Sequence, residues 1–172
     1  MEKCYYIAAA KGSTDALNNL GSYYEEIGNT EKMLKCYQEA IDRGNIKSMI
    51  NLGTYYATQG HKKEAVDCYT LAVNNGSPEA MFNLALFYEK ERDHPNMVKY
   101  YTLAANNAIV PAMFNLACYY NKIADYVNAS KYHTMAIHAD AVKWAKRRKE
   151  KYPVTTGYFY TFTPYYTLTL QE

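Results

Sequence analysis

Four cysteines and four histidines are the side chains in this sequence best suited to metal binding or nucleophilic catalysis. The cysteines stand at 4, 36, 68 and 118, and the histidines at 61, 94, 133 and 138. No two cysteines form the C-x-x-C pair of a zinc site, and no two histidines are four residues apart on one helical face. We therefore expect buried thiols and no metal site.

Other catalytic arrangements are also missing from the sequence. The glycines stand singly, so none forms the Gly-rich loop that cradles a phosphate. No Ser–His–acid or Cys–His set falls at positions that a regular fold would bring together. The sequence predicts a protein that is not an enzyme and uses no cofactor.

Asparagine is the polar side chain that recurs most regularly. The motif Asn-Leu-Gly-x-x-Tyr begins at Asn19 and Asn51, and Asn-Leu-Ala-x-x-Tyr begins at Asn83 and Asn115. A primary amide offers two donors and one acceptor oxygen, which suits pairing with the backbone of an extended peptide. The same amide can instead bond a neighbouring turn of its own chain, so a ligand-binding role and a structural role are both open.

The elements that carry these asparagines repeat every 32 residues without insertion or deletion. A second half-motif keeps the same step, with Tyr37, Tyr69 and Tyr101 each three residues before an alanine. Single glycines at 12, 44 and 76 end the units. Self-similarity at a fixed step of about 20 to 50 residues is the signature of a solenoid.

Apolar and small residues recur at helical spacing in two stretches of each unit, for example at Leu20 and Tyr24 and then at Tyr37 and Ala40. We expect an all-α superhelix of antiparallel helix pairs, roughly ten helices in a one-dimensional stack. The predicted solenoid covers 1–152, with a half repeat over 1–11, repeats over 12–43, 44–75, 76–107 and 108–139, and a capping helix over 140–152.

The spacing of Leu20, Gly21, Tyr24, Met33, Tyr37 and Ala40 resembles that of the tetratricopeptide repeat (TPR). The Asn-Leu-Gly-x-x-Tyr core, with its short return to the next unit, is more similar to the Sel-one-like repeat (SLR), a relative of that family. The usual loop between the two helices of an SLR is shortened here. The resemblance covers about residues 2–140. It implies adaptor or scaffold work, no reaction, and a concave surface lined by the first helix of each pair.

On such a surface the four asparagines would form a ladder. The residue before each ladder asparagine changes along the chain, from Asn18 to Ile50, Phe82 and Phe114. A variable position on a constant frame is where a solenoid usually encodes its partner. Phe82 and Phe114, extended by Leu86 and Cys118 one turn further on, would form an apolar strip that anchors a partner side chain. Packing between adjacent first helices is the alternative.

The repeat pattern ends after residue 140, because Arg148 stands where a fifth first helix would need leucine. Residues 143–151 carry six positive charges and one negative charge. The basic residues are Lys143, Lys146, Arg147, Arg148, Lys149 and Lys151. This segment is expected to be a solvated capping helix; a patch for RNA, DNA or an acidic partner, or a nuclear address, is the alternative.

Residues 153–172 follow a different pattern, in which aromatic residues and leucines alternate with threonines at a period of two. That period is typical of a β-strand. We expect an extended tail that lies on the solenoid or on another chain, or that has no evolved role.

The composition favours a soluble globular protein, with 49 % hydrophobic residues in 172 and a net charge of +2. No apolar run approaches the ~20 residues of a membrane helix, and the segment from Met1 to Tyr6 lacks signal-peptide features. We therefore expect a cytoplasmic chain, with the nucleus as an alternative. The abundance of Tyr, Asn and Lys hints at an AT-rich genome such as that of a large DNA virus, in which case the host cytoplasm or the virion is its location.

The sequence as a whole predicts a non-enzymatic adaptor that binds a protein or peptide partner in the groove. The first alternative is a structural assembly component that self-associates through the half repeat 1–11 or through the tail. The second alternative is a nucleic-acid-associated protein that uses the basic helix, although the small net charge gives no general attraction to nucleic acid.

Overall fold

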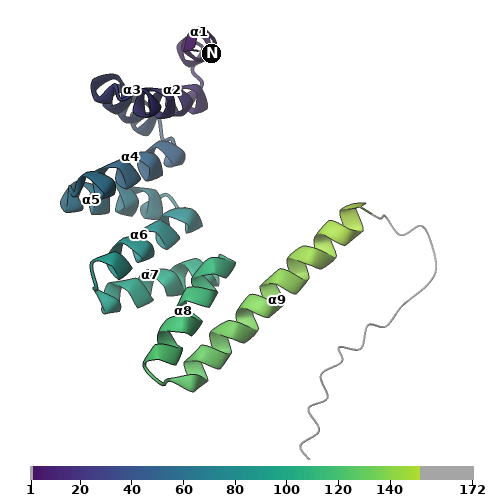
Figure 1. The fold of residues 1–172 in the computed structure, drawn as a ribbon. Helices are drawn as coiled ribbons and strands as arrows, with labels where there is room; N and C mark the ends of the chain where they lie inside the picture. Colours follow the sequence, from purple (N-terminus) through teal and green to yellow (C-terminus); the bar gives the residue numbers. More distant parts are fainter. Residues whose placement is uncertain (1, 152–172) are drawn as a thin grey trace, which may run out of the picture.

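The computed structural model describes the backbone of residues 2–151 and the side chains of residues 3–143. Within that range nine α-helices follow one another and no strand occurs (Figure 1). The helices are α1 (Glu2–Ala10), α2 (Thr14–Glu26), α3 (Thr30–Asp42), α4 (Ile46–Gln59), α5 (Lys62–Asn74), α6 (Pro78–Lys90), α7 (His94–Asn106), α8 (Val110–Lys122) and α9 (Tyr126–Lys151). The predicted all-α solenoid of antiparallel pairs is confirmed.

Side-chain caps fix where the first helices begin. Ser13, Asn45 and Ser77 each accept a hydrogen bond from the backbone N–H three residues later, which satisfies one of the donors left free at a helix start. Helix α8 has no such cap at Ile109, but Pro111 lies in its first turn. Proline has no N–H to satisfy there, so it marks the start of this helix in a different way.

The turns between helices pass through a residue with positive φ. At Gly44 the N–H bonds the Ile41 carbonyl at 2.8 Å, and the Asn45 N–H bonds the Ala40 carbonyl at 2.9 Å. This is the Schellman arrangement that glycine completes without steric strain. In the later repeats non-glycine residues take the same conformation, at Arg92, Ala108 and Ala124.

The core is built from the same positions in every pair. The motif leucines Leu20, Leu52, Leu84 and Leu116 are buried, as are the alanines Ala40, Ala72, Ala104 and Ala136. Fully burying a leucine side chain contributes roughly 1.5–3 kcal/mol, so the repeated leucines stabilise every unit. The alanines leave room for neighbouring helices to approach closely.

The pairs stack in chain order into a curved array, with α1 at one end and α9 at the other (Figure 1). Each first helix packs against its own second helix, and first helices also contact one another, α2 with α4 and α4 with α6. The second helices α3, α5 and α7 make no comparable contact with one another. The first helices therefore lie on the inner side of the curve.

Helix α9 differs from the sequence prediction of a separate capping helix over 140–152. The second helix of the last pair continues without a break to Lys151. Earlier second helices stop at a glycine or shortly before Pro111, whereas the stretch from Asp140 to Lys143 contains neither residue. The helix therefore continues, and the predicted extended tail over 153–172 lies outside the described residues.

Candidate partner-binding surface

The four ladder asparagines lie on the inner first helices but make different contacts. Asn19 is exposed, whereas Asn51, Asn83 and Asn115 are half-buried. Asn51 and Asn115 are engaged by neighbouring helices, and the side-chain amide of Asn83 makes no hydrogen bond within the described part of the chain. The structural role that the sequence left open therefore applies to Asn51 and Asn115, whereas a ligand-binding role stays open for Asn83.

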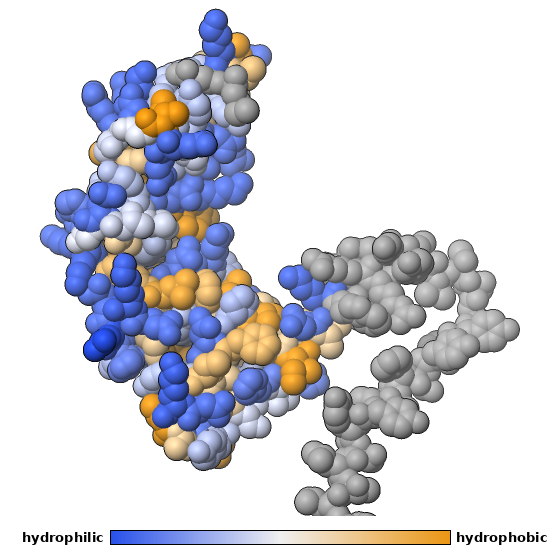
Figure 2. Space-filling model, viewed as in Figure 1, coloured by the Kyte–Doolittle hydropathy of each residue, from blue (hydrophilic) through white to orange (hydrophobic). Residues whose placement is uncertain are grey.

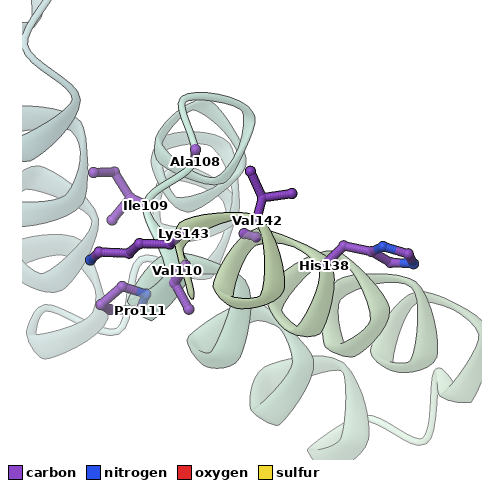
Figure 3. A pocket seen from close by; sticks show the side chains of 8 residues that line it. Ala108, Ile109, Val110, Pro111, His138, Val142 and Lys143 are labelled. Atoms are coloured by element: carbon purple, nitrogen blue, oxygen red, sulfur yellow. The ribbon is translucent and has the colours of Figure 1, made fainter. Parts of the chain in front are cut away.

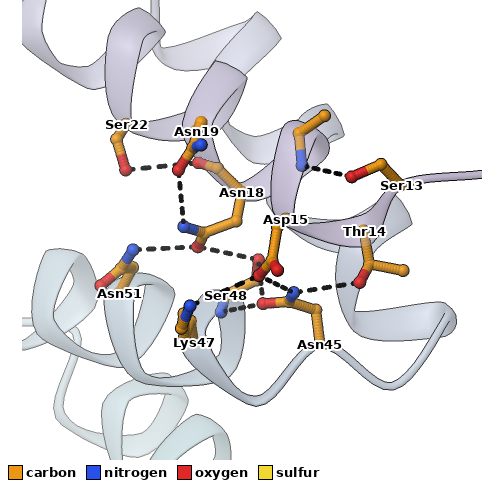
Figure 4. A network of polar contacts seen from close by, with 11 residues as sticks. Ser13, Thr14, Asp15, Asn18, Asn19, Ser22, Asn45, Lys47, Ser48 and Asn51 are labelled. Atoms are coloured by element: carbon orange, nitrogen blue, oxygen red, sulfur yellow. Dashed lines mark hydrogen bonds and ion pairs between the residues drawn. The ribbon is translucent and has the colours of Figure 1, made fainter. Parts of the chain in front are cut away.

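A buried polar network joins α2 to α4 (Figure 4). Asn18 Oδ1 accepts hydrogen bonds from Ser48 Oγ at 3.1 Å and from Asn51 Nδ2 at 3.0 Å. Asn45 Oδ1 accepts from the backbone N–H of Ser48 at 2.9 Å, and Asn45 Nδ2 donates to Thr14 Oγ1 at 3.2 Å. Asn18, the first of the variable positions, therefore bonds the next repeat instead of facing a ligand.

The hydroxyl of Tyr101 links three helices on the inner side of the stack. It donates to Glu89 Oε2 of α6 at 2.5 Å and accepts from Asn115 Nδ2 of α8 at 2.8 Å. Burial raises the pKa of Tyr101, and the hydrogen bond and charge of Glu89 raise it further. Asn115 is therefore part of a Glu–Tyr–Asn triad that ties α6, α7 and α8 together.

Tyr37 forms the same kind of triad two repeats earlier. Its hydroxyl donates to Glu25 Oε2 at 3.0 Å and contacts Ser22 Oγ at 3.1 Å. Burial, the largest influence, raises the pKa of Tyr37 to about 12, while hydrogen bonds to Ser22 and Asn51 act in the opposite direction. Sequence reasoning did not single out Glu25 and Glu89; their recurrence at one position, 64 residues apart, is the signal that could have found them.

The repeat between these two lacks the triad. Ala57 stands where the first and third repeats have glutamate, and the Tyr69 hydroxyl pairs with Thr54 Oγ1 at 3.0 Å. The amide of Asn83 is therefore left without a protein partner in the described part of the chain. Its half-buried donors and acceptor remain available for a ligand.

The predicted apolar strip is partly exposed. Phe114 and Leu86 are each 40 % exposed on α8 and α6, and Phe82 is half-buried with its ring 5.7 Å from that of Tyr101. Ile50 is only 6 % exposed and lies in the core, so it supports the frame and offers no surface to a partner. Figure 2 shows apolar residues gathered over the half of the molecule that contains α6 to α9.

A second apolar feature is an open hollow of about 500 Å³ between the α7–α8 turn and α9 (Figure 3). Ile109, Val110 and Pro111 line one side, and His138 and Val142 line the other. In the earlier repeats the second helix ends at this level and the first helix of the next pair begins. Because α9 continues without a break, no such helix within the described residues fills the hollow. The hollow contains no constellation of reactive groups.

The expectation of buried thiols holds for only part of the set: Cys36 is buried and Cys68 is half-buried, whereas Cys4 and Cys118 are exposed because they lie on helix faces that no neighbouring helix covers. Burial raises the pKa of the Cys68 thiol to about 11, and it also raises that of Cys36. A thiol with a raised pKa is a poor nucleophile and a poor metal ligand at neutral pH. Among the described residues, no group of three or more His, Cys, Asp or Glu side chains could hold a metal ion.

The basic segment belongs to the last turns of α9. Lys143 is exposed. The other predicted basic residues, Lys146, Arg147, Arg148, Lys149 and Lys151, have helical backbone, but their side chains lie outside the described part. Within that part, no helix is long and apolar enough to cross a membrane.

Comparisons with known proteins bear on this architecture. A family model described as the tetratricopeptide repeat matches residues 14–43 and 46–74. No curated protein sequence matches the chain.

Several solved structures share the fold. One is a protective antigen of uropathogenic Escherichia coli with an SLR fold, at 24 % identity and a TM-score of 0.64; the alignment covers 78 % of this chain and 32 % of that one. A Sel1 repeat protein from Oxalobacter formigenes is 25 % identical with a TM-score of 0.62, over 80 % of this chain and 63 % of that one. MamA is 19 % identical with a TM-score of 0.61, over 88 % and 90 %. The chain thus spans less than two thirds of the first and second of these structures.

Repeats of this kind generally mediate protein–protein interaction, and their families are typically non-enzymatic scaffolds. The 32-residue helix pairs, the family match and the shared fold agree with one another, and the resemblance inferred from the sequence is confirmed. The chain has a helical-repeat fold of the TPR/SLR-like kind, and its residues 14–43 and 46–74 match the tetratricopeptide repeat.

Proposed function

We propose that this protein is a scaffold that binds an extended peptide segment of a partner protein across the first helices α6 and α8. One observation carries the proposal: Leu86 and Phe114 are exposed on consecutive first helices, and the side-chain amide of Asn83, three residues before Leu86 on α6, is unengaged. The cytoplasmic location expected from the sequence is part of the proposal.

The surface has the two components that peptide recognition needs. Exposed leucine and phenylalanine gain about 25 cal/mol for each Å² of apolar surface that a partner covers. The amide of Asn83 can donate to and accept from the backbone of an extended segment. The triads and the core leucines hold α6 and α8 in place, so little ordering is required when the partner binds.

A displayed library of random peptides, followed by fluorescence anisotropy on the selected sequences, tests the proposal. Phe114→Ser and Leu86→Ser should each weaken binding by about tenfold, as expected for apolar anchors at the centre of an interface. Asn83→Ala should also weaken binding. The melting temperature should change little, because neither apolar side chain is fully buried.

Leu103 on the second helix α7 provides a matched control. It is 37 % exposed, close to the value for Leu86, but it lies on the outer row of helices. Leu103→Ser should leave peptide binding unchanged. Failure to select any peptide, or an equal loss of binding at Leu103 and Leu86, would contradict the proposal.

Self-association is a second candidate, favoured by a specific observation at α1. Tyr6 and Ile7 are 47 % and 59 % exposed on this helix. An apolar face of this kind can join two copies of the chain. Light scattering at micromolar concentration should show an oligomer that Ile7→Ser dissociates; a monomer in both samples removes this candidate.

A further inference from the structure

Glu89 lies at the edge of the apolar strip on α6. Phe82, Leu86 and Glu89 are four and then three residues apart, so their side chains share one face of the helix. Lys90, the next residue, is turned away from Glu89 by about 100° around the helix axis. The surface next to Leu86 therefore combines an apolar side chain with a single carboxylate.

This carboxylate is held in place but not neutralised. The Tyr101 hydroxyl, on a side chain that is 1 % exposed, donates to Glu89 Oε2 and is itself bonded by Asn115. The ion pairs among the described residues join Arg43 to Glu39, Lys47 to Asp15 and Lys62 to Glu91. None of them involves Glu89, so its negative charge has no cationic partner in the described part of the chain.

We propose that this surface selects a partner segment in which a lysine or arginine lies close to an apolar side chain. The apolar side chain would cover Leu86 and Phe114, and the cation would pair with Glu89. This inference rests on the proposed function, because it specifies the partner of the same surface.

The geometry favours a useful contribution from the ion pair. An exposed pair usually gains little, partly because two flexible side chains must be ordered. Here Tyr101 already orients one partner, so less conformational freedom is lost on binding. The apolar side chain of the bound segment would also exclude water from one side of the pair, which strengthens the attraction.

The first repeat contains a matched control. Glu25 is bonded by Tyr37 in the same way as Glu89 is by Tyr101. However, polar Asn18 and Ser22 occupy the positions that correspond to Phe82 and Leu86. The carboxylate is thus present there without an apolar anchor, and we expect no selection of the same segment at Glu25.

The test uses an array of short peptides with a Gly-Ser background. Each peptide carries one Leu and one Phe, together with Lys, Gln or Glu at each remaining position in turn. The best peptides of the Lys series should bind about fivefold more tightly than their Gln counterparts, which is the factor for an ion pair of about 1 kcal/mol, and the Glu series should bind more weakly still. Raising the ionic strength should reduce that advantage in the unmodified protein.

Glu89→Gln should abolish the preference for lysine while keeping an acceptor for the Tyr101 hydroxyl, and Glu25→Gln should leave the preference unchanged.

Equal binding of the three series by the unmodified protein overturns this inference but leaves the proposed function standing. A preference that persists in Glu89→Gln, or that is insensitive to salt, also overturns it. If no peptide of any series binds, the proposed function itself fails. A chain that dimerises, and whose dimer Glu89→Gln dissociates, shows that the occupant is a second copy, which likewise overturns the inference.

Discussion

The ring of Tyr37 lies directly against the backbone of Gly21. A β-carbon added to Gly21 would come 2.4 Å from Tyr37 Cε1 and 2.5 Å from Cδ1. The same contact recurs one repeat later, where a β-carbon on Gly53 would lie 2.9 Å from Tyr69 Cδ1. In the first two repeats the motif glycine therefore allows the two helices of the pair to approach closely.

Gly21→Ala should destabilise the protein by ~1–3 kcal/mol, because the fully buried Tyr37 ring has little room to move away from the new methyl group. Gly53→Ala should cost less, since its contact with Tyr69 is longer. Urea denaturation followed by circular dichroism measures both changes. Glu26→Ala, at an exposed position on the same helix, is the control; a loss of stability no larger than that control would show that the pair can spread apart.

A second prediction concerns the turns that take positive φ without glycine. An L-residue in this conformation costs ~1–2 kcal/mol, which glycine avoids. Ala108→Gly and Ala124→Gly should therefore raise the free energy of unfolding, each by about 1 kcal/mol after the entropy that glycine adds to the unfolded chain.

Gly76→Ala, at the turn equivalent to Ala108, should have the opposite effect on stability. Thermal unfolding of the three single variants under one set of conditions makes this comparison. Lower stability in Ala108→Gly would mean that the methyl group of Ala108 contributes more than its backbone strain costs.

The sequence was sufficient to predict the all-α solenoid, because the motif leucines, the paired tyrosine and alanine and the turn glycines repeat at one step. It was not sufficient for the contacts of the individual asparagines. Those contacts depend on whether the previous repeat offers a tyrosine hydroxyl with a glutamate, as at Glu89, or an alanine, as at Ala57. The continuation of α9 was missed for a related reason: the period ends there, but no glycine or proline ends the helix.

The different surroundings of Asn51 and Asn83 lead to a third prediction. Asn51→Ala removes a hydrogen bond to the buried Asn18 and should cost ~1–3 kcal/mol of stability. Asn83→Ala breaks no hydrogen bond within the described residues, so it should leave stability nearly unchanged while weakening peptide binding. Chemical denaturation of both variants provides the comparison, and an equal loss of stability in the two would assign Asn83 a structural role as well.

The last prediction concerns alkaline pH. Burial raises the pKa of Tyr37 to about 12 in the folded protein, against an ordinary value of 10.0, and it raises the pKa of Tyr69 and Tyr101 in the same direction. Above pH 10 the unfolded chain therefore loses these protons before the folded chain does, and each lost proton favours unfolding. The contribution that these protonated tyrosines make to folding stability is complete below pH 10. For Tyr37 that contribution is lost progressively as the pH rises to about 12. The free energy of unfolding, measured in urea at a series of pH values, should be flat from neutral pH to about pH 8. It should decline first as the Cys36 and Cys68 thiols, whose ordinary pKa is 9.0, titrate in the unfolded chain, and more steeply above pH 10 as the tyrosines follow. Tyr37→Phe should start from a lower stability, because the hydrogen bond to Glu25 is lost, but its decline with pH should be shallower. An identical decline in the variant and the unmodified protein would show that Tyr37 titrates in the folded state at its ordinary pKa and is less enclosed than its burial indicates.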